Sequence, residues 1–520
     1  MTKFEKELET LNPFEIAEKL REASPKDKAI YDAGRGNPNW INTTSRKAFA
    51  KILNFGCMEN PIYGDAGMSL IPENKGIAEE FERYLRAENG EAEAFLLQVL
   101  DFAKSENWTM DDFVAELVHG TLGDNYPVPS RILKYCERVQ NRFFEDILYG
   151  NRSLERESQI FATEGGSAAI CYIFNSLKEN FLIRSYDKIA INTPIFPPYL
   201  DIPVLNDYEL VEVDIESSPQ NNWQIDVDEL DKLKNPEIKV FFLVNPSNPS
   251  AMALSTEVLD KLEEVVAENP GLMIVTDDVY ATFVPGFESI YARCPKNTVL
   301  VYSFSKLYGA TGWRVGDVII NKNNIFDEKI AELPAVQKEI LKNRYAKVST
   351  DVENFSFIER IMADSRAIGL AHTAGVATPA QIMQMLFSFV HILDDENKYE
   401  KASNALVKKR ATAFYEVLGY HKFEYPLYTY YYGLVNIYRL ARKRHNEAFA
   451  TFLEENYEEI NFSVRLTERF GIMLLRGLGF GTQAGELRIS FSNLNSYEFP
   501  IVAQAILDVM DSYYDEFLKQ

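Results

Sequence analysis

The centre of the chain alternates between short apolar runs and longer amphipathic segments. A segment such as 255–271 is typical of a helix, with Ser255 or Thr256 as N-cap and Gly271 near its end. Four apolar, β-branched runs that stop at Asn, Asp, Ser or Pro predict strands, namely 188–196, 238–248, 272–280 and 297–305. Apolar strands alternating with helices predict an α/β fold with a mostly parallel central sheet flanked by helices.

The flanking segments have other patterns. Residues 66–120 are acidic and helical in pattern, and the first 20 residues have the pattern of an amphipathic helix. Residues 422–440 are typical of a strand. We therefore predict a smaller α+β domain and the following division: an N-terminal arm joining the small domain (1–50), a large cofactor-binding domain with a helical insertion at about 66–120 (51–390), and the C-terminal small domain (391–520).

Composition excludes several classes of function. The 520 residues carry a formal net charge of -23, which disfavours nucleic acid and anionic membranes as partners. Four cysteines without a CxxC pair and five scattered histidines indicate neither a disulfide framework nor a metal site. Without an apolar leader or membrane-spanning run, we expect a soluble, cytoplasmic protein.

One lysine follows the fourth predicted strand, in VYSFSKLYGATGWRVG (301–316). Burial lowers the pKa of such an amine and makes Lys306 a candidate nucleophile or base toward an aldehyde cofactor. A surface lysine in a loop is the alternative. The hydroxyls of Ser303 and Ser305 and the guanidinium of Arg314 suit a phosphate monoester.

Further polar residues follow the other strands. The Gly-Gly turn before a predicted helix offers the backbone N–H groups of Gly166 and Ser167 to a phosphate, although an ordinary tight turn has the same sequence. Asp277 ends a buried strand, where its carboxylate needs a cation such as a protonated pyridine nitrogen; an N-cap is the alternative, which Asp278 also fits. Tyr280 and Asn248 are candidates to hydrogen-bond a phenolate oxygen; for Asn248, an ordinary proline-rich turn is the alternative.

An aromatic ring, Phe196, follows the first strand and either stacks on a flat cofactor ring or belongs to the core. Ligands of parallel sheets bind beyond the carboxyl ends of the strands, so these side chains should converge. Together they suit pyridoxal 5′-phosphate (PLP), whose phosphate, ring nitrogen and aldehyde each need a protein partner.

The chain resembles fold-type I PLP enzymes of the aspartate aminotransferase superfamily. SFSKLYGATGWRVG is similar to the S-x-S-K-x(5)-G-x-R-x-G motif, D-x-x-Y (277–280) to the ring contacts, and NPSNPSA to N-P-x-N-P-T-G, with Ala251 in place of glycine. YPVP resembles the segment whose tyrosine, here Tyr126, reaches the neighbouring subunit's phosphate. ELRISFSN resembles the segment whose arginine, here Arg488, binds the substrate α-carboxylate.

Within this superfamily, the length, the helical insertion and the stretch YDAGRGNPNW resemble the aspartate 4-decarboxylase family, which implies an active-site role for Arg35. The resemblance implies conversion of L-aspartate to L-alanine and CO2, transamination with 2-oxo acids as a side activity, and a homodimer or larger homo-oligomer. A plain aminotransferase for aspartate, another dicarboxylic or an aromatic amino acid is the alternative. Weaker alternatives are a C–S lyase, a PLP-dependent transcription regulator and a non-catalytic scaffold. For Arg476 we favour a surface loop position.

Overall fold

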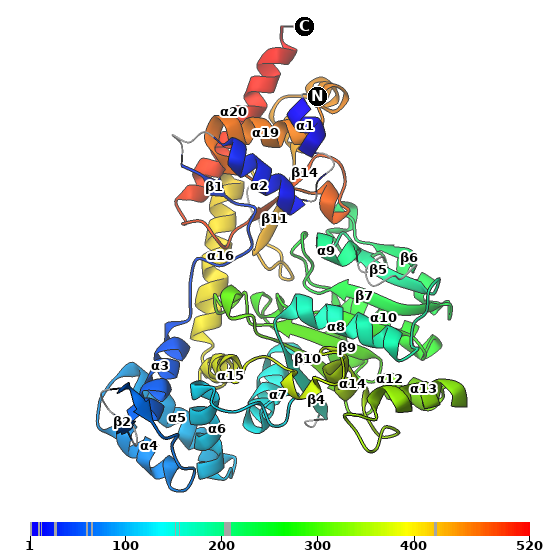
Figure 1. Cartoon of the computed structure of the whole chain (residues 1–520). Helices are drawn as coiled ribbons and strands as arrows, with labels where there is room; N and C mark the ends of the chain where they lie inside the picture. Colours follow the sequence, from blue (N-terminus) through cyan, green and yellow to red (C-terminus); the bar gives the residue numbers. More distant parts are fainter. Residues whose placement is uncertain are drawn as a thin grey trace.

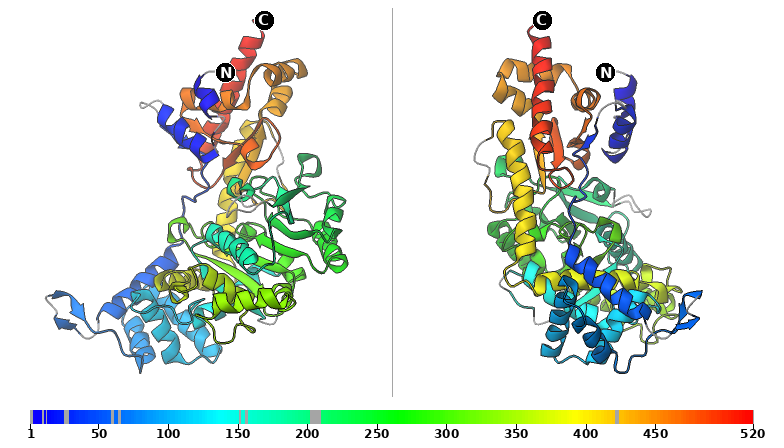
Figure 2. Two further views of the ribbon diagram at one scale, coloured as in Figure 1. Left: turned by 45° about the vertical axis from the view of Figure 1, so that its right-hand side comes forward. Right: turned by 90° about the vertical axis from the view of Figure 1, so that its left-hand side faces the viewer.

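The computed structural model describes the chain except residues 1–2, 9–10, 12, 25–28, 59–60, 64–65, 151, 155–156, 202–209, 421–423 and 520. A central sheet with helices on both sides forms the middle of the molecule, a helical bundle lies below it, and both termini lie above it (Figure 1). Figure 2 shows that the long helix after residue 398 runs from the central part up to the terminal part.

Seven strands form the central sheet, in the order β4-β10-β9-β8-β7-β5-β6. All pairs among β5 to β9 are parallel, whereas β10 runs antiparallel to both of its neighbours. The four predicted strands are confirmed as β5, β7, β8 and β9. The strands span Ser158–Thr163 (β4), Lys188–Thr193 (β5), Val211–Glu216 (β6), Ile238–Val244 (β7), Met273–Asp277 (β8), Thr298–Ser303 (β9) and Gly316–Asn321 (β10).

Successive side chains of the buried strands point to opposite faces of the sheet and pack into two different hydrophobic clusters. These strands are therefore apolar throughout. Val240 and Phe242 of β7 join the cluster with α8, whereas Phe241 and Leu243 join the cluster with α10. The helices of this part are α7 (Lys134–Leu148), α8 (Gly166–Glu179), α9 (Pro197–Leu200), α10 (Thr256–Glu268), α11 (Ile290–Arg293), α12 (Ile325–Ala331), α13 (Ala335–Tyr345), α14 (Phe357–Asp364) and α15 (Thr378–Ile392).

The helix predicted at 255–271 is confirmed as α10. The hydroxyl of Ser255 accepts a hydrogen bond from the Val258 N–H, so Ser255 rather than Thr256 is the N-cap. Likewise α8 begins at Gly166, as the Gly-Gly turn predicts.

Residues 43–122 form a helical bundle beside the sheet, in agreement with the helical pattern of residues 66–120. The bundle begins earlier than that segment, because α3 packs against α5, α6 and α15. Its elements are α3 (Thr43–Met58), the β2–β3 hairpin (Pro61–Tyr63 and Met68–Ser69), α4 (Ile77–Arg86), α5 (Glu91–Ser105) and α6 (Met110–Leu122).

The N-terminal segment lies on the C-terminal part of the chain. β1 (Tyr31–Asp32) pairs in parallel with β12, and helices α1 (Lys3–Leu8) and α2 (Pro13–Ala23) pack on α19. The single N-terminal helix is therefore wrong: the segment contains two helices, and Pro13, which lacks an N–H, starts the second. The domain boundaries at residues 50 and 390 stay a prediction.

The C-terminal part contains a three-stranded antiparallel sheet, β11-β14-β13. Among the described residues of the predicted strand at 422–440, Tyr432–Asn436 form β11. The strand ends there because the Asn436 side chain accepts from the Arg439 N–H and caps α17. The remaining elements are α16 (Lys398–Val417), β11 (Tyr432–Asn436), α17 (Ile437–Arg444), α18 (Glu447–Asn456), α19 (Glu459–Phe470), β12 (Ile472–Met473), β13 (Leu475–Arg476), β14 (Glu486–Ser490) and α20 (Glu498–Phe517).

Candidate active site

One cavity of about 410 Å³ lies at the carboxyl ends of β7, β8 and β9, where the sheet meets the N-terminal arm and the C-terminal part. Of the thirteen predicted site residues, all but Tyr126 line it: Arg35, Gly166, Ser167, Phe196, Asn248, Asp277, Tyr280, Ser303, Ser305, Lys306, Arg314 and Arg488. The predicted convergence is thus observed, since parallel strands bring their ends to one edge of the sheet.

A cluster of hydroxyl, N–H and guanidinium donors lies at one end of the cavity. α8 starts there at Gly166, so that its first N–H groups are without partners in the helix. The Ser303 hydroxyl donates to that of Ser305 over 3.0 Å. Arg314 donates to the Glu164 carbonyl over 3.1 Å, and a Cβ on Gly165 would lie 2.7 Å from its Nη2. A glycine is therefore needed beside the guanidinium.

A buried carboxylate faces the cavity from the end of β8. Burial raises the pKa of Asp277 to about 6, while hydrogen bonds from the Tyr199 hydroxyl (2.8 Å) and the Val279 N–H (3.3 Å) and the charge of Lys306 act in the opposite direction. A Cβ on Gly166 would be 3.9 Å from Oδ2 of Asp277, so a flat ring can approach this carboxylate. A cation here would relieve the cost of the buried charge.

The candidate nucleophile lies between the sheet and the N-terminal arm. Nζ of Lys306 donates to the Gly36 carbonyl over 3.2 Å and lies 5.9 Å from the ring centre of Tyr280. The hydroxyls of Tyr280 and Tyr432 are 2.9 Å apart. A Cβ on Gly36 would be only 2.0 Å from the Tyr432 hydroxyl, so this arm approaches the tyrosine as closely as a glycine permits.

A buried arginine from β14 closes the opposite side of the cavity. Arg488 is 2% exposed, donates to Oδ1 of Asn248 (2.9 Å) and to the Gly34 carbonyl (2.6 Å), and lies over the Tyr432 ring. Its Nε has no hydrogen-bond partner. A buried guanidinium with an unused donor needs an anion, and a carboxylate supplies two acceptors in the matching geometry.

Two further arginines have different surroundings. The side chain of Arg35 is 64% exposed and is held by an ion pair with Asp32 at 3.2 Å. The surface position favoured for Arg476 is wrong: Arg476 is buried in the edge strand β13, 3.5 Å from Glu459, because α2 and α19 pack against this strand. It does not line the cavity. Tyr126 is 73% exposed and also lies outside the cavity.

Sequence reasoning missed several cavity residues, notably Tyr199, Tyr432 and Gly36. Tyr199 had a weak signal, because it follows Phe196 by three residues in a short proline-started helix. Tyr432 had none, since it is one of five aromatic or hydroxyl residues in the run YTYYY. Their roles depend on contacts between segments far apart in the chain.

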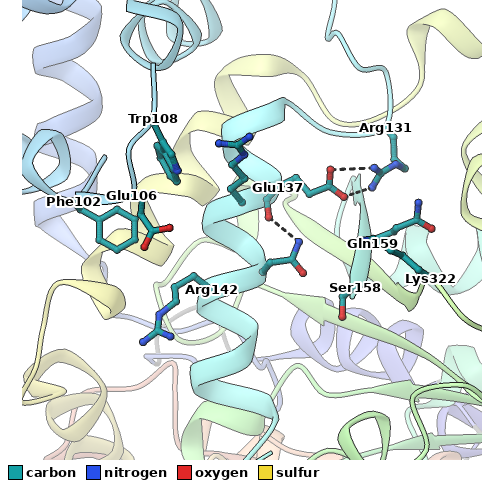
Figure 3. A pocket seen from close by; sticks show the side chains of 11 residues that line it. Phe102, Glu106, Trp108, Arg131, Glu137, Arg142, Ser158, Gln159 and Lys322 are labelled. Carbon is teal, nitrogen blue, oxygen red and sulfur yellow. Dashed lines mark hydrogen bonds and ion pairs between the residues drawn. The ribbon is translucent and has the colours of Figure 1, made fainter. Parts of the chain in front are cut away.

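A second cavity, of about 480 Å³, opens between α5, α7 and the edge strand β4 (Figure 3). Its principal charges are already paired: Arg131 binds Glu137 at 2.6 and 3.1 Å, and Arg142 binds Asp146 at 3.1 Å. In the figure Arg142 points away from the Arg131–Glu137 pair. Lacking a nucleophile beside a buried acid, this cavity is a weaker candidate than the cavity at Lys306.

The residues of the Lys306 cavity fit PLP. The donors around α8 suit its phosphate, Asp277 suits its ring nitrogen, and Lys306 suits its aldehyde. Across the part of the chain that the structure describes, no three metal-ligating side chains gather in one place. Nor do the described helices include one with the length and apolar character to cross a membrane.

Comparisons with known proteins identify the family. A family model described as "Aminotransferase class I and II" matches residues 124–506. The chain is 38% identical, over 99% of both chains, to a Pseudomonas protein named bifunctional aspartate aminotransferase and L-aspartate beta-decarboxylase. It is 33% identical to an aspartate/prephenate aminotransferase of Nitrosomonas europaea, over 25% of this chain and 34% of that protein.

Solved structures share the fold. The aspartate aminotransferase of Thermus thermophilus with maleate superposes with a TM-score of 0.61 at 15% identity, covering 98% of this chain and 99% of the other. An aromatic aminotransferase of Pyrococcus horikoshii gives 0.59 at 15% identity, covering 95% and 99%. Given the family match over residues 124–506 and the full-length Pseudomonas relative, the chain belongs to the class I and II aminotransferases, which are PLP enzymes of fold type I.

Proposed function

We propose that the protein is a PLP-dependent L-aspartate 4-decarboxylase that forms L-alanine and CO2, with aspartate aminotransferase activity on the same site. The observation that carries the proposal is the unequal pair of arginines around Lys306. Arg488 is buried and rigidly held, whereas Arg35 is mostly exposed with one charged partner. The name of the full-length Pseudomonas relative supports the same pair of activities.

Each end of the substrate has a suitable partner. Arg488 binds the α-carboxylate as a bidentate pair, using the Nε that is otherwise unsatisfied. The Lys306 amine is placed to move the proton at the substrate Cα. With PLP in the cavity, Asp277 would hold a proton at its ring nitrogen, and Tyr280 would donate to its ring oxygen. PLP would supply an electron-accepting ring for the pair left by the Cα proton, and a C=N bond to Cα for the pair left by the β-carboxylate.

Loss of CO2 makes a specific demand on Arg35. A tight bidentate clamp on the β-carboxylate would stabilise the group that must leave and oppose the reaction. The exposed Arg35 side chain, tethered to Asp32 at 3.2 Å, orients that carboxylate without enclosing it. Asp32 also pairs with Arg21, which divides its charge between two guanidinium groups and leaves Arg35 free to shift.

The test is a product assay with purified enzyme, PLP and L-aspartate in the absence of any 2-oxo acid. Sustained equimolar release of CO2 and L-alanine is expected, and Lys306→Ala should abolish it. Lys322→Ala, which removes an exposed lysine far from the cavity, is the matched control and should keep full activity. If wild type releases no CO2 but forms oxaloacetate once 2-oxoglutarate is added, the protein is a plain aminotransferase.

The protein's assembly and location follow from the same family. We propose a homodimer or a larger homo-oligomer in which Tyr126 reaches the phosphate site of the neighbouring subunit. Tyr126 is exposed and lies outside the cavity of its own chain, and both observations support this arrangement. All four cysteines are free thiols, which supports a reducing cytoplasm.

A further inference from the structure

Tyr432 touches all three parts of the chain that enclose the cavity, yet neither the motifs nor the proposed chemistry uses it. It begins β11 and is almost completely buried. Its hydroxyl lies 2.9 Å from that of Tyr280, which follows β8 of the central sheet. Its ring centre lies 4.3 Å from the Arg488 guanidinium carbon. The N-terminal arm contacts it through Gly36, where a Cβ would be 2.0 Å from the hydroxyl.

We propose that Tyr432 is a positioning residue that holds the Tyr280 hydroxyl through its own hydroxyl and the Arg488 guanidinium through the face of its ring. It thereby links the group that contacts the cofactor oxygen to the group that binds the substrate carboxylate. The inference rests on the proposed PLP site but holds for either a decarboxylase or an aminotransferase.

The direction of the hydrogen bond follows from the role of Tyr280 in the proposed site. Burial raises the pKa of Tyr280 well above its usual value, and the neighbouring Tyr432 and Tyr431 add to this. Burial acts on Tyr432 too, but the charges of Lys306 and Arg488 outweigh it and lower the pKa of Tyr432. These shifts alone do not choose the donor, because either hydroxyl can donate over the 2.9 Å between them. A tyrosine hydroxyl has one proton, and in the proposed site Tyr280 gives its proton to the cofactor oxygen. Toward Tyr432 it can then only accept, so Tyr432 is the donor in the loaded site.

The ring performs the second task. An aromatic face attracts a guanidinium most strongly where water is excluded, as it is around Arg488. Phe480 lies at 4.7 Å from the same guanidinium carbon, so the cation lies near two rings. Because Asn248 and the Gly34 carbonyl occupy its two terminal nitrogens, the rings act mainly on its orientation.

Two variants separate the two tasks. Tyr432→Phe removes the hydroxyl and keeps the ring, whereas Tyr432→Leu removes both. Tyr415→Phe is the matched control. The buried hydroxyl of Tyr415 donates over 3.3 Å to the carbonyl of Leu434, which lies in β11 together with Tyr432, and Tyr415 does not line the cavity. Circular dichroism and thermal unfolding would verify that each variant folds.

The first readout is the absorbance of enzyme-bound cofactor against pH. A donor to the ring oxygen stabilises its anionic form, and that donor weakens when it no longer accepts a hydrogen bond. In Tyr432→Phe the pH at the midpoint of this absorbance titration should therefore rise by about half a pH unit. Tyr415→Phe should titrate like wild type. A Tyr432→Phe midpoint equal to that of wild type, an equal shift in Tyr415→Phe, or no titration in wild type would overturn the role of the hydroxyl.

The second readout is the affinity for succinate, an unreactive dicarboxylate, followed through the same absorbance. Tyr432→Phe should bind it within about twofold of wild type, and Tyr432→Leu about tenfold more weakly. Equal affinities in the two variants would overturn the role of the ring. Both readouts precede any bond breaking. If both readouts give the expected results but the wild-type enzyme releases no CO2 from aspartate, the proposed decarboxylase function is wrong and the role of Tyr432 still stands.

Discussion

The Tyr199 hydroxyl donates a 2.8 Å hydrogen bond to Oδ2 of Asp277, and both side chains are buried where they line the Lys306 cavity. Asp277 is the one predicted acid of the site, but Tyr199 follows a different strand, 78 residues earlier in the chain. The bond favours the ionised carboxylate against the burial that opposes it. In the proposed site, Asp277 would hold a protonated ring nitrogen near neutral pH, and this role would depend partly on Tyr199.

Replacing Tyr199 by phenylalanine should move the pH dependence of cofactor binding. Loss of the donor raises the pKa of Asp277 above about 6, so the carboxylate stays protonated to higher pH. Cofactor affinity falls as the pH drops through this pKa. The midpoint of this pH profile should lie about one pH unit higher in the variant than in wild type, and kcat should fall several-fold. Fluorescence titration of the apoenzyme from pH 5 to 9 measures the midpoint.

Tyr345→Phe provides the control for this experiment. Its hydroxyl also donates to a buried aspartate, Asp364, over 2.8 Å, but away from the cavity. It should leave the midpoint unchanged even if it lowers stability. An unshifted midpoint in Tyr199→Phe would show that Asp277 does not depend on this bond.

Asp277→Asn should make the apoenzyme more stable and the holoenzyme inactive. The folded pKa of about 6 lies above the ordinary aspartate pKa of 3.8, so the fold favours the protonated acid and loses stability as the pH rises from about 3.8 through 6. The ionised carboxylate then costs up to about 3 kcal/mol at pH 7.5, a cost that asparagine avoids. Thermal unfolding of both apoproteins should show the larger difference at pH 7.5 and a smaller one at pH 4.5. A variant less stable than wild type at both pH values would contradict this view of the site.

Arg35→Gln should discriminate between amino-acid substrates. If Arg35 orients only the side-chain carboxylate, kcat/KM for L-aspartate should fall about tenfold, a modest factor because the group is largely exposed. Transamination of L-alanine, which has no such carboxylate, should stay within about twofold of wild type. Arg488→Gln is the comparison and should lower kcat/KM for both L-aspartate and L-alanine, because every amino acid presents an α-carboxylate. Equal losses for both substrates in Arg35→Gln would assign Arg35 a general structural role.

Mixed oligomers test whether Tyr126 acts across a subunit boundary. Lys306→Ala and Tyr126→Ala subunits should each be inactive or strongly impaired alone. In a hybrid, the site that keeps Lys306 receives Tyr126 from the Lys306→Ala neighbour and is complete. Co-expression with two affinity tags should therefore yield hybrids that recover up to about half of the wild-type activity per dimer, as one intact site in two requires. Hybrids no more active than the Tyr126→Ala parent would place the action of Tyr126 within its own chain.

Local sequence determined the elements whose physics is local. Near-continuous apolar runs specify β5, β7, β8 and β9, and the Ser255–Thr256 pair specifies the start of α10 to within one residue, because each depends on neighbours a few residues away. The parallel arrangement then brings Asp277, Ser303 and the residues after them to one edge. Ten cavity-lining residues were predicted from strand ends and the turns after them, whereas Arg35 and Arg488 came from the family resemblance alone.

Tertiary structure decided what depends on packing between distant segments. The exposure of Arg35, the burial of Arg476 and the contacts of Tyr199 and Tyr432 join residues that lie far apart in the chain. No local pattern distinguishes Tyr432 from the other tyrosines of its run, because the difference is created by Tyr280, Arg488 and Gly36 around it. The chain's motifs therefore specify the cofactor and the candidate nucleophile, whereas the balance of charge and hydrogen bonding around them exists only once the N-terminal arm, the sheet and the C-terminal part are packed together.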